Sequence, residues 1–98
     1  MKIYLNEQDV ANAICVFVAD LERIHPEEVQ IEFLFNEEEG VSCLVKMYNR
    51  SFNYGEQQMS DAIGFFLDEV HRFSSHSMEI IIHFNEDEGI TSEVSFTY

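Results

Sequence analysis

Two kinds of hydrophobic spacing alternate along the 98-residue chain. Within residues 10–24, and again within residues 59–73, apolar side chains recur every three or four positions, which is the spacing of one helix face. The pattern therefore predicts two amphipathic helices. Their apolar faces comprise Val10, Ala13, Ile14, Phe17, Val18, Leu21 and Ile24 in the first, and Met59, Ala62, Ile63, Phe66, Leu67, Val70 and Phe73 in the second.

Local signals predict where the first helix begins and ends. Asn6 is a favourable N-cap residue, and Asp9 stands three positions later, where a capping box needs an acceptor. His25 precedes Pro26 and therefore disfavours helical geometry, so we expect the helix to end near Ile24. Arg23 would then lie in the last turn, where a cation complements the helix dipole.

Outside the predicted helices, apolar and polar residues alternate with a period of two, the pattern of half-buried strands. Residues 2–5 form a further, short apolar strand. For residues 49–55 we favour an extension of the preceding strand; a strand equivalent to residues 1–6 and a simple connector are the alternatives. The four rows predicted to face inward are Val29, Ile31, Phe33 and Phe35; Val41, Cys43, Val45 and Met47; Met78, Ile80, Ile82 and Phe84; and Ile90, Ser92, Val94 and Phe96.

Each pair of long strands encloses an acidic turn, Asn-Glu-Glu-Glu-Gly at residues 36–40 and Asn-Glu-Asp-Glu-Gly at residues 85–89. The second turn is displaced by 49 positions, and at this repeat displacement 13 residues are identical between 7–49 and 56–98. Because the helix period and the strand period stay in phase together, we interpret the chain as an internal duplication. The first repeat would span 1–49 and the second repeat 50–98, each an αββ or βαββ unit.

One apolar stripe on each helix and one apolar face on each hairpin predict the fold class. We expect a single α+β domain over residues 1–98, a two-layer sandwich with two helices on one face of a mostly antiparallel sheet. Strand order across the sheet stays open.

Charge narrows the classes of partner. Nineteen acidic residues oppose five basic ones, which gives a net charge of −14. Nucleic acids and anionic membranes both require positive potential, so we expect direct binding to neither. Attraction to cations or to a basic protein is expected instead.

The amino-terminal residues and the cysteines bear on localisation. The first six residues carry one charge and no apolar stretch, unlike a signal peptide, and the longest apolar run, residues 13–19, is far shorter than the ~20 residues of a membrane span. Cys15 and Cys43 show no paired spacing, as expected of reduced thiols. These features predict a cytoplasmic protein.

Several stretches resemble a family of small bacterial proteins. They are Asn6-Glu7-Gln8-Asp9-Val10, Asn12-Ala13-Ile14-Cys15, Pro26-Glu27-Glu28-Val29 and Glu86-Asp87-Glu88-Gly89-Ile90. Together they resemble the YxcD-like domain of unknown function found in bacilli. The resemblance implies a soluble cytoplasmic protein and implies neither an activity nor any site residue.

The acidic turns are the first candidates for chemistry. Carboxylate oxygens are the ligands that calcium and magnesium prefer, so the candidate metal ligands are Glu37, Glu38, Glu39, Glu86, Asp87 and Glu88. Neighbouring side chains in a tight turn diverge, however, and the spaced pattern of a calcium loop is absent. Solvated turns are therefore the favoured interpretation. Placement of both turns at one end of the molecule would strengthen the metal hypothesis.

Histidines and cysteines offer weaker candidates. His25, His71, His76 and His83, with Glu69 or Asp68, make a transition-metal site conceivable, but no ligand spacing supports it and surface histidines are favoured. Neither cysteine has a histidine at a readable spacing, and no glycine-rich phosphate loop is present. We expect no enzymatic activity and no cofactor.

Apolar residues in polar surroundings suggest an association surface. Val16 and Phe65 lie off the apolar faces of their predicted helices, and Leu34, Leu44, Tyr48 and Ile81 interrupt the polar face of the predicted sheet. They fit either a homodimer interface or scattered surface residues. The leading functional hypothesis is a non-enzymatic interaction or structural protein that binds a basic partner. The alternative is a divalent-cation-binding protein that uses the acidic turns.

Overall fold

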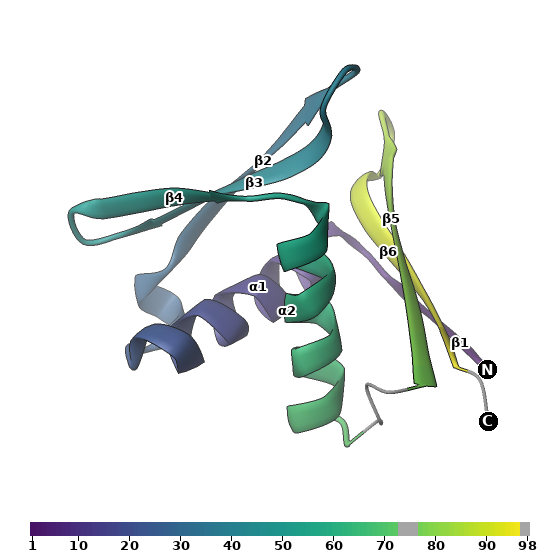
Figure 1. Cartoon of the computed structure of the whole chain (residues 1–98), viewed down its shortest axis with the longest axis horizontal. Coiled ribbons are helices and arrows are strands. Elements are labelled where there is room, and N and C mark those ends of the chain that lie inside the picture. Colours follow the sequence, from purple (N-terminus) through teal and green to yellow (C-terminus); the bar gives the residue numbers. More distant parts are fainter. Residues whose placement is uncertain (73–76, 97–98) are drawn as a thin grey trace.

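A computed structural model of the chain describes residues 1–72 and 77–96 (Figure 1). Its elements are β1 (Lys2–Leu5), α1 (Glu7–Glu22), the short 3₁₀ helix η1 (Pro26–Glu28), β2 (Gln30–Asn36), β3 (Gly40–Met47), β4 (Arg50–Tyr54), α2 (Glu56–Glu69), β5 (Met78–Asn85) and β6 (Gly89–Phe96). The α+β class predicted from the sequence is confirmed. Phe73 and His76, named above, lie outside the described residues.

The strands form two antiparallel sheets. Sheet A has the order β1-β6-β5 and sheet B the order β2-β3-β4. The first strand of each half of the chain pairs with the last strand of the other half: Ile3 is opposite Val94, and Phe52 is opposite Val45. The repeat displacement seen in the sequence therefore maps the register of one sheet onto that of the other.

The expectation of a single sheet was wrong. Each hairpin pairs with one strand from the other half of the chain, and no described strand joins the two sheets. The favoured interpretation of residues 49–55 was wrong as well. The chain reverses at Tyr48, whose φ of 49° is left-handed, and β4 returns antiparallel to β3. A separate strand equivalent to β1, one of the alternatives, is what forms.

The core lies where the helices meet the sheets. In Figure 1 the two sheets diverge from the hairpin tips, and both helices lie in the angle between them. Each helix contacts strands of both sheets, and the two helices contact each other. The fully buried side chains include Ile14, Val45, Met59, Ile63 and Val94. The predicted inward rows of β3 and β6 are buried along their whole length.

The predicted capping of α1 is confirmed, but both helices end earlier than expected. Asn6 Oδ1 accepts from the Asp9 amide at 2.8 Å, and an Asp9 carboxylate oxygen accepts from the Asn6 amide at 3.1 Å. Arg23 adopts the left-handed conformation and closes α1 as a C-cap instead of lying in its last turn. Leu21 and Val70 were predicted to face inward and are instead exposed, because they lie at or beyond these ends.

Gly40 and Gly89 are the matched turn glycines, and both have a positive φ, at 82° and 75°. A Cβ added to Gly89 would lie 2.7 to 3.0 Å from three atoms of the Glu7 carboxylate, whereas one added to Gly40 would lie 3.0 Å from a single oxygen of Glu56. The Glu7 carboxylate also accepts from the Ile90 amide at 3.4 Å. The first residue of α1 is thus packed against the start of β6.

We predict that Gly89→Ala destabilises the protein more than Gly40→Ala. Both changes incur the left-handed backbone cost of about 1–2 kcal/mol, and the first also displaces the Glu7 carboxylate from its hydrogen bond with the Ile90 amide, which adds a small further cost. Urea unfolding would show a larger fall in midpoint for Gly89→Ala at an unchanged m value. Adding Glu7→Ala should shrink the difference. Equal midpoints for the two glycine variants would contradict this packing.

Candidate functional site

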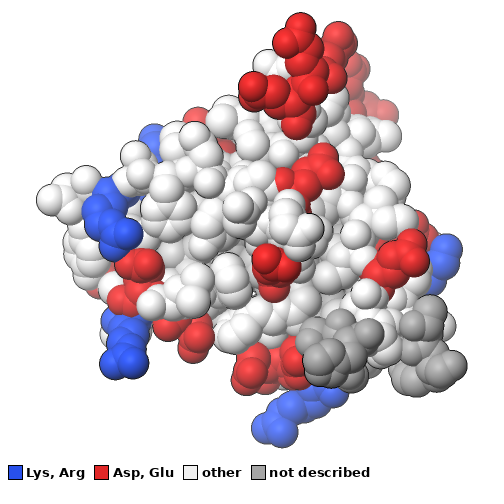
Figure 2. Space-filling view, viewed as in Figure 1, with Lys and Arg blue, Asp and Glu red and all other residues white. Residues whose placement is uncertain are grey.

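The two acidic turns lie at the same end of the molecule. Phe35 of β2 and Phe84 of β5, which occupy matched positions of the two repeats, stack with their ring centroids 4.3 Å apart and an interplanar angle of 9°. The hairpin tips therefore lie side by side, and Figure 2 shows Asp and Glu side chains gathered at this point. We call the tips and the two rings the acidic apex: Phe35, Glu37, Glu38, Glu39, Phe84, Glu86, Asp87 and Glu88.

Hydrogen bonds within each turn shape the acidic apex in the same way. Asn36 Oδ1 accepts from the amides of Glu38 at 2.7 Å and Glu39 at 3.3 Å. Asn85 Oδ1 accepts from the matched amides of the second turn at 2.8 and 3.3 Å. The turn carboxylates are all exposed. Both predicted turns are therefore braced at the backbone and carry their charge in solvent.

The structure brings the candidate metal ligands of the two acidic turns to the same end of the molecule, but the described residues do not form a metal-coordinating arrangement. Among the residues that the structure describes, no three His, Cys, Asp or Glu side chains converge closely enough to hold a metal ion. Glu37, Glu38 and Glu39 occupy consecutive positions in a turn, where side chains diverge. The acidic apex is a region of dense negative charge without a described cage of ligands.

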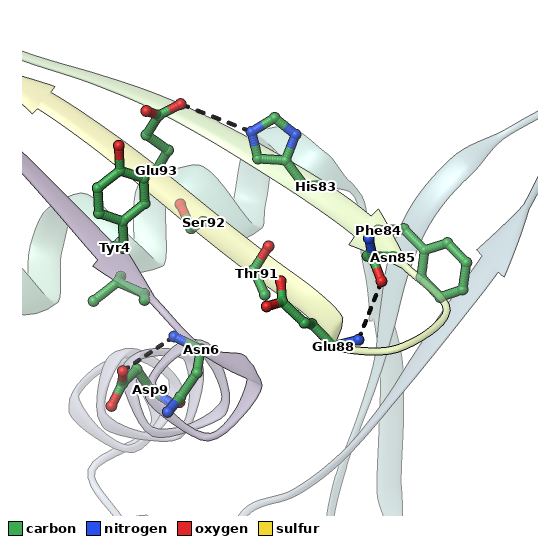
Figure 3. Close-up of a pocket in the computed structure, with 11 residues that line it drawn as sticks. Tyr4, Asn6, Asp9, His83, Phe84, Asn85, Glu88, Thr91, Ser92 and Glu93 are labelled. Carbon is green, nitrogen blue, oxygen red and sulfur yellow. Dashed lines mark hydrogen bonds and ion pairs between the residues drawn. The ribbon is translucent and has the colours of Figure 1, made fainter.

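A groove of about 840 Å³ runs from the acidic apex along sheet A (Figure 3). It begins at Phe84 and Glu88, passes Thr91, and reaches Tyr4 and Glu93. Asn6 and Asp9, at the start of α1, form its opposite side. The groove exists because β1 ends at Leu5, so that β6 continues to the acidic apex without a strand on that side among the described residues.

Glu93 is the centre of a polar network on the outer face of sheet A. Its carboxylate lies 3.0 Å from Lys2 Nζ and 3.9 Å from His83 Nε2. The hydrogen bond from Lys2 is the main cause that lowers the pKa of Glu93, and the same bond raises the pKa of Lys2. Tyr4 and His83 make smaller contributions that also lower the pKa of Glu93. Glu93 is therefore ionised at neutral pH.

The matched face of sheet B carries different chemistry. The repeat positions equivalent to Tyr4, Glu93 and His83 hold Asn53, Leu44 and Leu34. The inward rows of both sheets are apolar apart from the buried Ser92, which is matched to Cys43, so the larger difference lies on the surface. The polar network on sheet A is therefore not required to form a sheet of this shape, because sheet B forms without it.

The six predicted association residues do not form one patch. Leu34 and Leu44 lie on sheet B, with Leu34 exposed and Leu44 half-buried, while Ile81 lies on sheet A. Tyr48 is exposed but donates a hydrogen bond to Glu28 Oε1 at 2.6 Å. Val16 is half-buried, and the ring of Phe65 packs edge-on against Phe17 at 5.4 Å, so it has an intramolecular role between the helices. The homodimer stays a prediction.

The described histidines are dispersed. His25 precedes η1, His71 packs against the Phe66 ring at 5.2 Å, and His83 faces Glu93. Both thiols lie in or against the core, and burial raises the pKa of Cys15 and raises that of Cys43 to about 12. They are protonated at neutral pH, a state that disfavours nucleophilic attack.

Sequence reasoning missed Lys2, Tyr4 and Glu93 as members of a site. The alternation of β6 places Glu93 on the outer face, which was readable from the sequence. The partners of Glu93 come from the other end of the chain, through the pairing of β1 with β6, and strand order was open.

No described helix is both long enough and apolar enough to cross a membrane.

The fold and the site define a small acidic α+β protein with a charged apex and an adjoining groove. By sequence, the chain belongs to the family described as "Protein of unknown function (DUF2653)", whose model matches residues 1–88. It is similar to "Uncharacterized protein YxcD" of Bacillus subtilis (strain 168), with 39% identity over 41 residues. That alignment covers 41% of this chain and 40% of the relative. No solved structure matches the chain. The resemblance inferred from the sequence is confirmed.

We predict that Lys2→Met raises the pKa of Glu93 toward its ordinary value, because the substitution removes the donor that favours the ionised form. The pKa of Glu28 is lowered chiefly by Tyr48 and serves as the internal control. Tyr48→Phe should raise the pKa of Glu28 and leave that of Glu93 unchanged. Carboxyl-carbon NMR titration measures both. A Glu93 pKa that ignores Lys2→Met would contradict the network.

The lowered pKa of Glu93 determines how its contribution to the free energy of unfolding changes with pH. The contribution of Glu93 is present above the unfolded-state pKa of about 4.3 and is lost as the pH falls through the lower folded-state pKa. The free energy of unfolding of Lys2→Met should therefore decrease less steeply than that of the unmodified protein as the pH falls below about 4.3.

Proposed function

We propose that this protein is a non-enzymatic, cytoplasmic interaction module that binds a lysine- or arginine-rich segment of a partner protein at the acidic apex. The observation that carries this proposal is the stack of Phe35 on Phe84, which supports two acidic turns side by side. The turns supply six carboxylates in a small exposed area. Such a density of charge raises the local concentration of a cationic partner and speeds its association.

The two rings add a short-range contribution to this attraction. Phe35 and Phe84 are 47% and 40% exposed although they stack on each other, so part of each ring remains available. An arginine or lysine over a phenylalanine face contributes ~0.5–1 kcal/mol at an exposed site. A cationic side chain can use both the carboxylates and the ring faces, whereas a divalent ion needs several converging oxygen ligands, which the described residues of the acidic apex do not offer.

The internal duplication proposed from the sequence is consistent with this function. Both sheets share one register at the repeat displacement, and both hairpins end in the same asparagine-supported turn. Two copies of one unit present their tips together when the axis that relates them runs along the hairpins, an arrangement that the Phe35–Phe84 stack supports. The charge of one turn would thus have been doubled by duplication.

We predict that Glu37→Gln, Glu38→Gln and Glu86→Gln, combined, weaken binding of a fluorescent hexa-arginine peptide at least tenfold at low salt. The control combines Asp20→Asn, Glu27→Gln and Glu69→Gln, which neutralise the same number of exposed carboxylates away from the acidic apex. It should weaken binding less than twofold. Fluorescence anisotropy at two ionic strengths measures both, and binding to the unmodified protein should fall as salt rises.

Equal losses for the two triple variants would overturn the proposal, because binding would then follow net charge alone. The divalent-cation hypothesis is tested in the same protein by calorimetry with calcium, magnesium and manganese. Saturable heat at micromolar metal that disappears in the apex variant would favour that alternative over a basic segment.

A further inference from the structure

A second surface lies along β5, away from the acidic apex. β5 is at the edge of sheet A, and no described strand pairs with its outer side. The N–H and C=O groups of the even-numbered residues of β6 point toward β1, as the hydrogen bond from the Phe96 amide to the Met1 carbonyl shows. Its odd-numbered residues therefore face β5. Opposite them are Glu79, Ile81 and His83, so the even-numbered residues of β5 turn their N–H and C=O groups to the open edge.

A groove of about 610 Å³ accompanies this edge, between β5 and α2. Met78 and Ile80 form its strand side, and Gly64 and Phe65 form its helix side. Gly64 is buried in the middle of α2, where glycine is less favourable than alanine. A Cβ at this position would lie 3.5 Å from Ile80 Cδ1, which is ordinary contact. Packing within the chain therefore does not require glycine there.

The matched position in α1 shows what a side chain does in this place. Cys15 is the repeat equivalent of Gly64, and its Sγ lies 3.7 Å from the carbonyl oxygen of Val29, the residue matched to Met78. The thiol thus fills the space between α1 and the start of β2. Beside α2 the same space is open, because Gly64 has no side chain to fill it.

The open groove also carries charge that its counterpart lacks. Asp61 and Asp68 line it, whereas the matched residues of α1 are Asn12 and Ala19. Glu79 is exposed on the outer face of β5 itself. Acidic residues therefore lie on both sides of an edge whose backbone groups match an added strand.

We propose that β5 and α2 bind an extended segment of a partner protein by strand addition. The segment alternates apolar residues, which enter the groove beside Gly64, with lysine or arginine residues, which lie on the outer face of the sheet next to Glu79. Main-chain hydrogen bonds to the even-numbered residues of β5 provide affinity, and the groove selects the alternating side chains. This surface is separate from the acidic apex, so the inference does not rest on the function proposed above.

The probe is a fluorescent Lys-Val-Lys-Val-Lys-Val peptide, used with two analogues that are N-methylated at the lysines or at the valines. Only one edge of an added strand pairs with β5, so only one set of alternate amides is needed. We expect one analogue to bind as the parent peptide does and the other to bind at least tenfold more weakly. Equal affinities of the two analogues would overturn strand addition.

Gly64→Cys transfers the α1 residue into α2 and should weaken binding of the parent peptide at least tenfold. Gly64→Ala should weaken it less and should raise the melting temperature, so lost binding cannot be ascribed to lost folding. Glu79→Gln should weaken binding, whereas Asp20→Asn on α1, with the same change in charge, should not. Unchanged binding to Gly64→Cys would overturn the proposed groove.

The variants also separate this inference from binding at the acidic apex. If the peptide bound only there, its affinity would fall in the apex triple variant, would not change with Gly64→Cys, and would not discriminate between the N-methylated analogues. That result would overturn the inference. Persistence of the discrimination in the apex variant supports strand addition at β5.

Discussion

The exchange of first strands between the two halves of the chain is the constraint on which the rest of the structure depends. β1 completes the sheet of the second hairpin, and β4 completes the sheet of the first. Each exchanged strand leads directly into a helix, so the helix start is fixed against the hairpin of the other half. Glu7 lies against Gly89 and Glu56 against Gly40 for this reason. Neither half can bury its apolar face without the other, and the shared core of α1, α2 and both sheets follows from that dependence.

This closure has an electrostatic consequence. Two hairpins related in this way present their tips at one end, and in this chain both tips are acidic. Bringing like charges together is unfavourable, and the Phe35–Phe84 stack offsets part of the repulsion by ~0.5–1.5 kcal/mol beyond its area burial. An uncharged apex would therefore make the folded protein more stable. Charges that cost stability at this place are expected if they attract a partner.

Much of the fold was readable from the sequence, because helix and strand periods are local properties. The inward rows of β3 and β6 were identified residue by residue, including the buried Ser92. Local pattern cannot specify which strand lies beside which, and the exchange of strands decides that question. The reversal at Tyr48 was missed because a left-handed tyrosine leaves no composition signal. Phe65 lies off the apolar face of its own helix, and spacing within one helix cannot predict its contact with Phe17 of the other helix. The acidic turns were identified, but their adjacency and the Glu93 network depend on contacts between the ends of the chain.

Native-state amide hydrogen exchange of the intact protein tests the exchange of strands most directly. If β1 is part of the cooperative core, the protected amides at the β1–β6 boundary should open with the same free energy as those at the β3–β4 boundary, close to that of global unfolding. Amides of β1 and the adjoining edge of β6 that exchange like a fraying terminus, while β3 and β4 stay protected, would contradict the account.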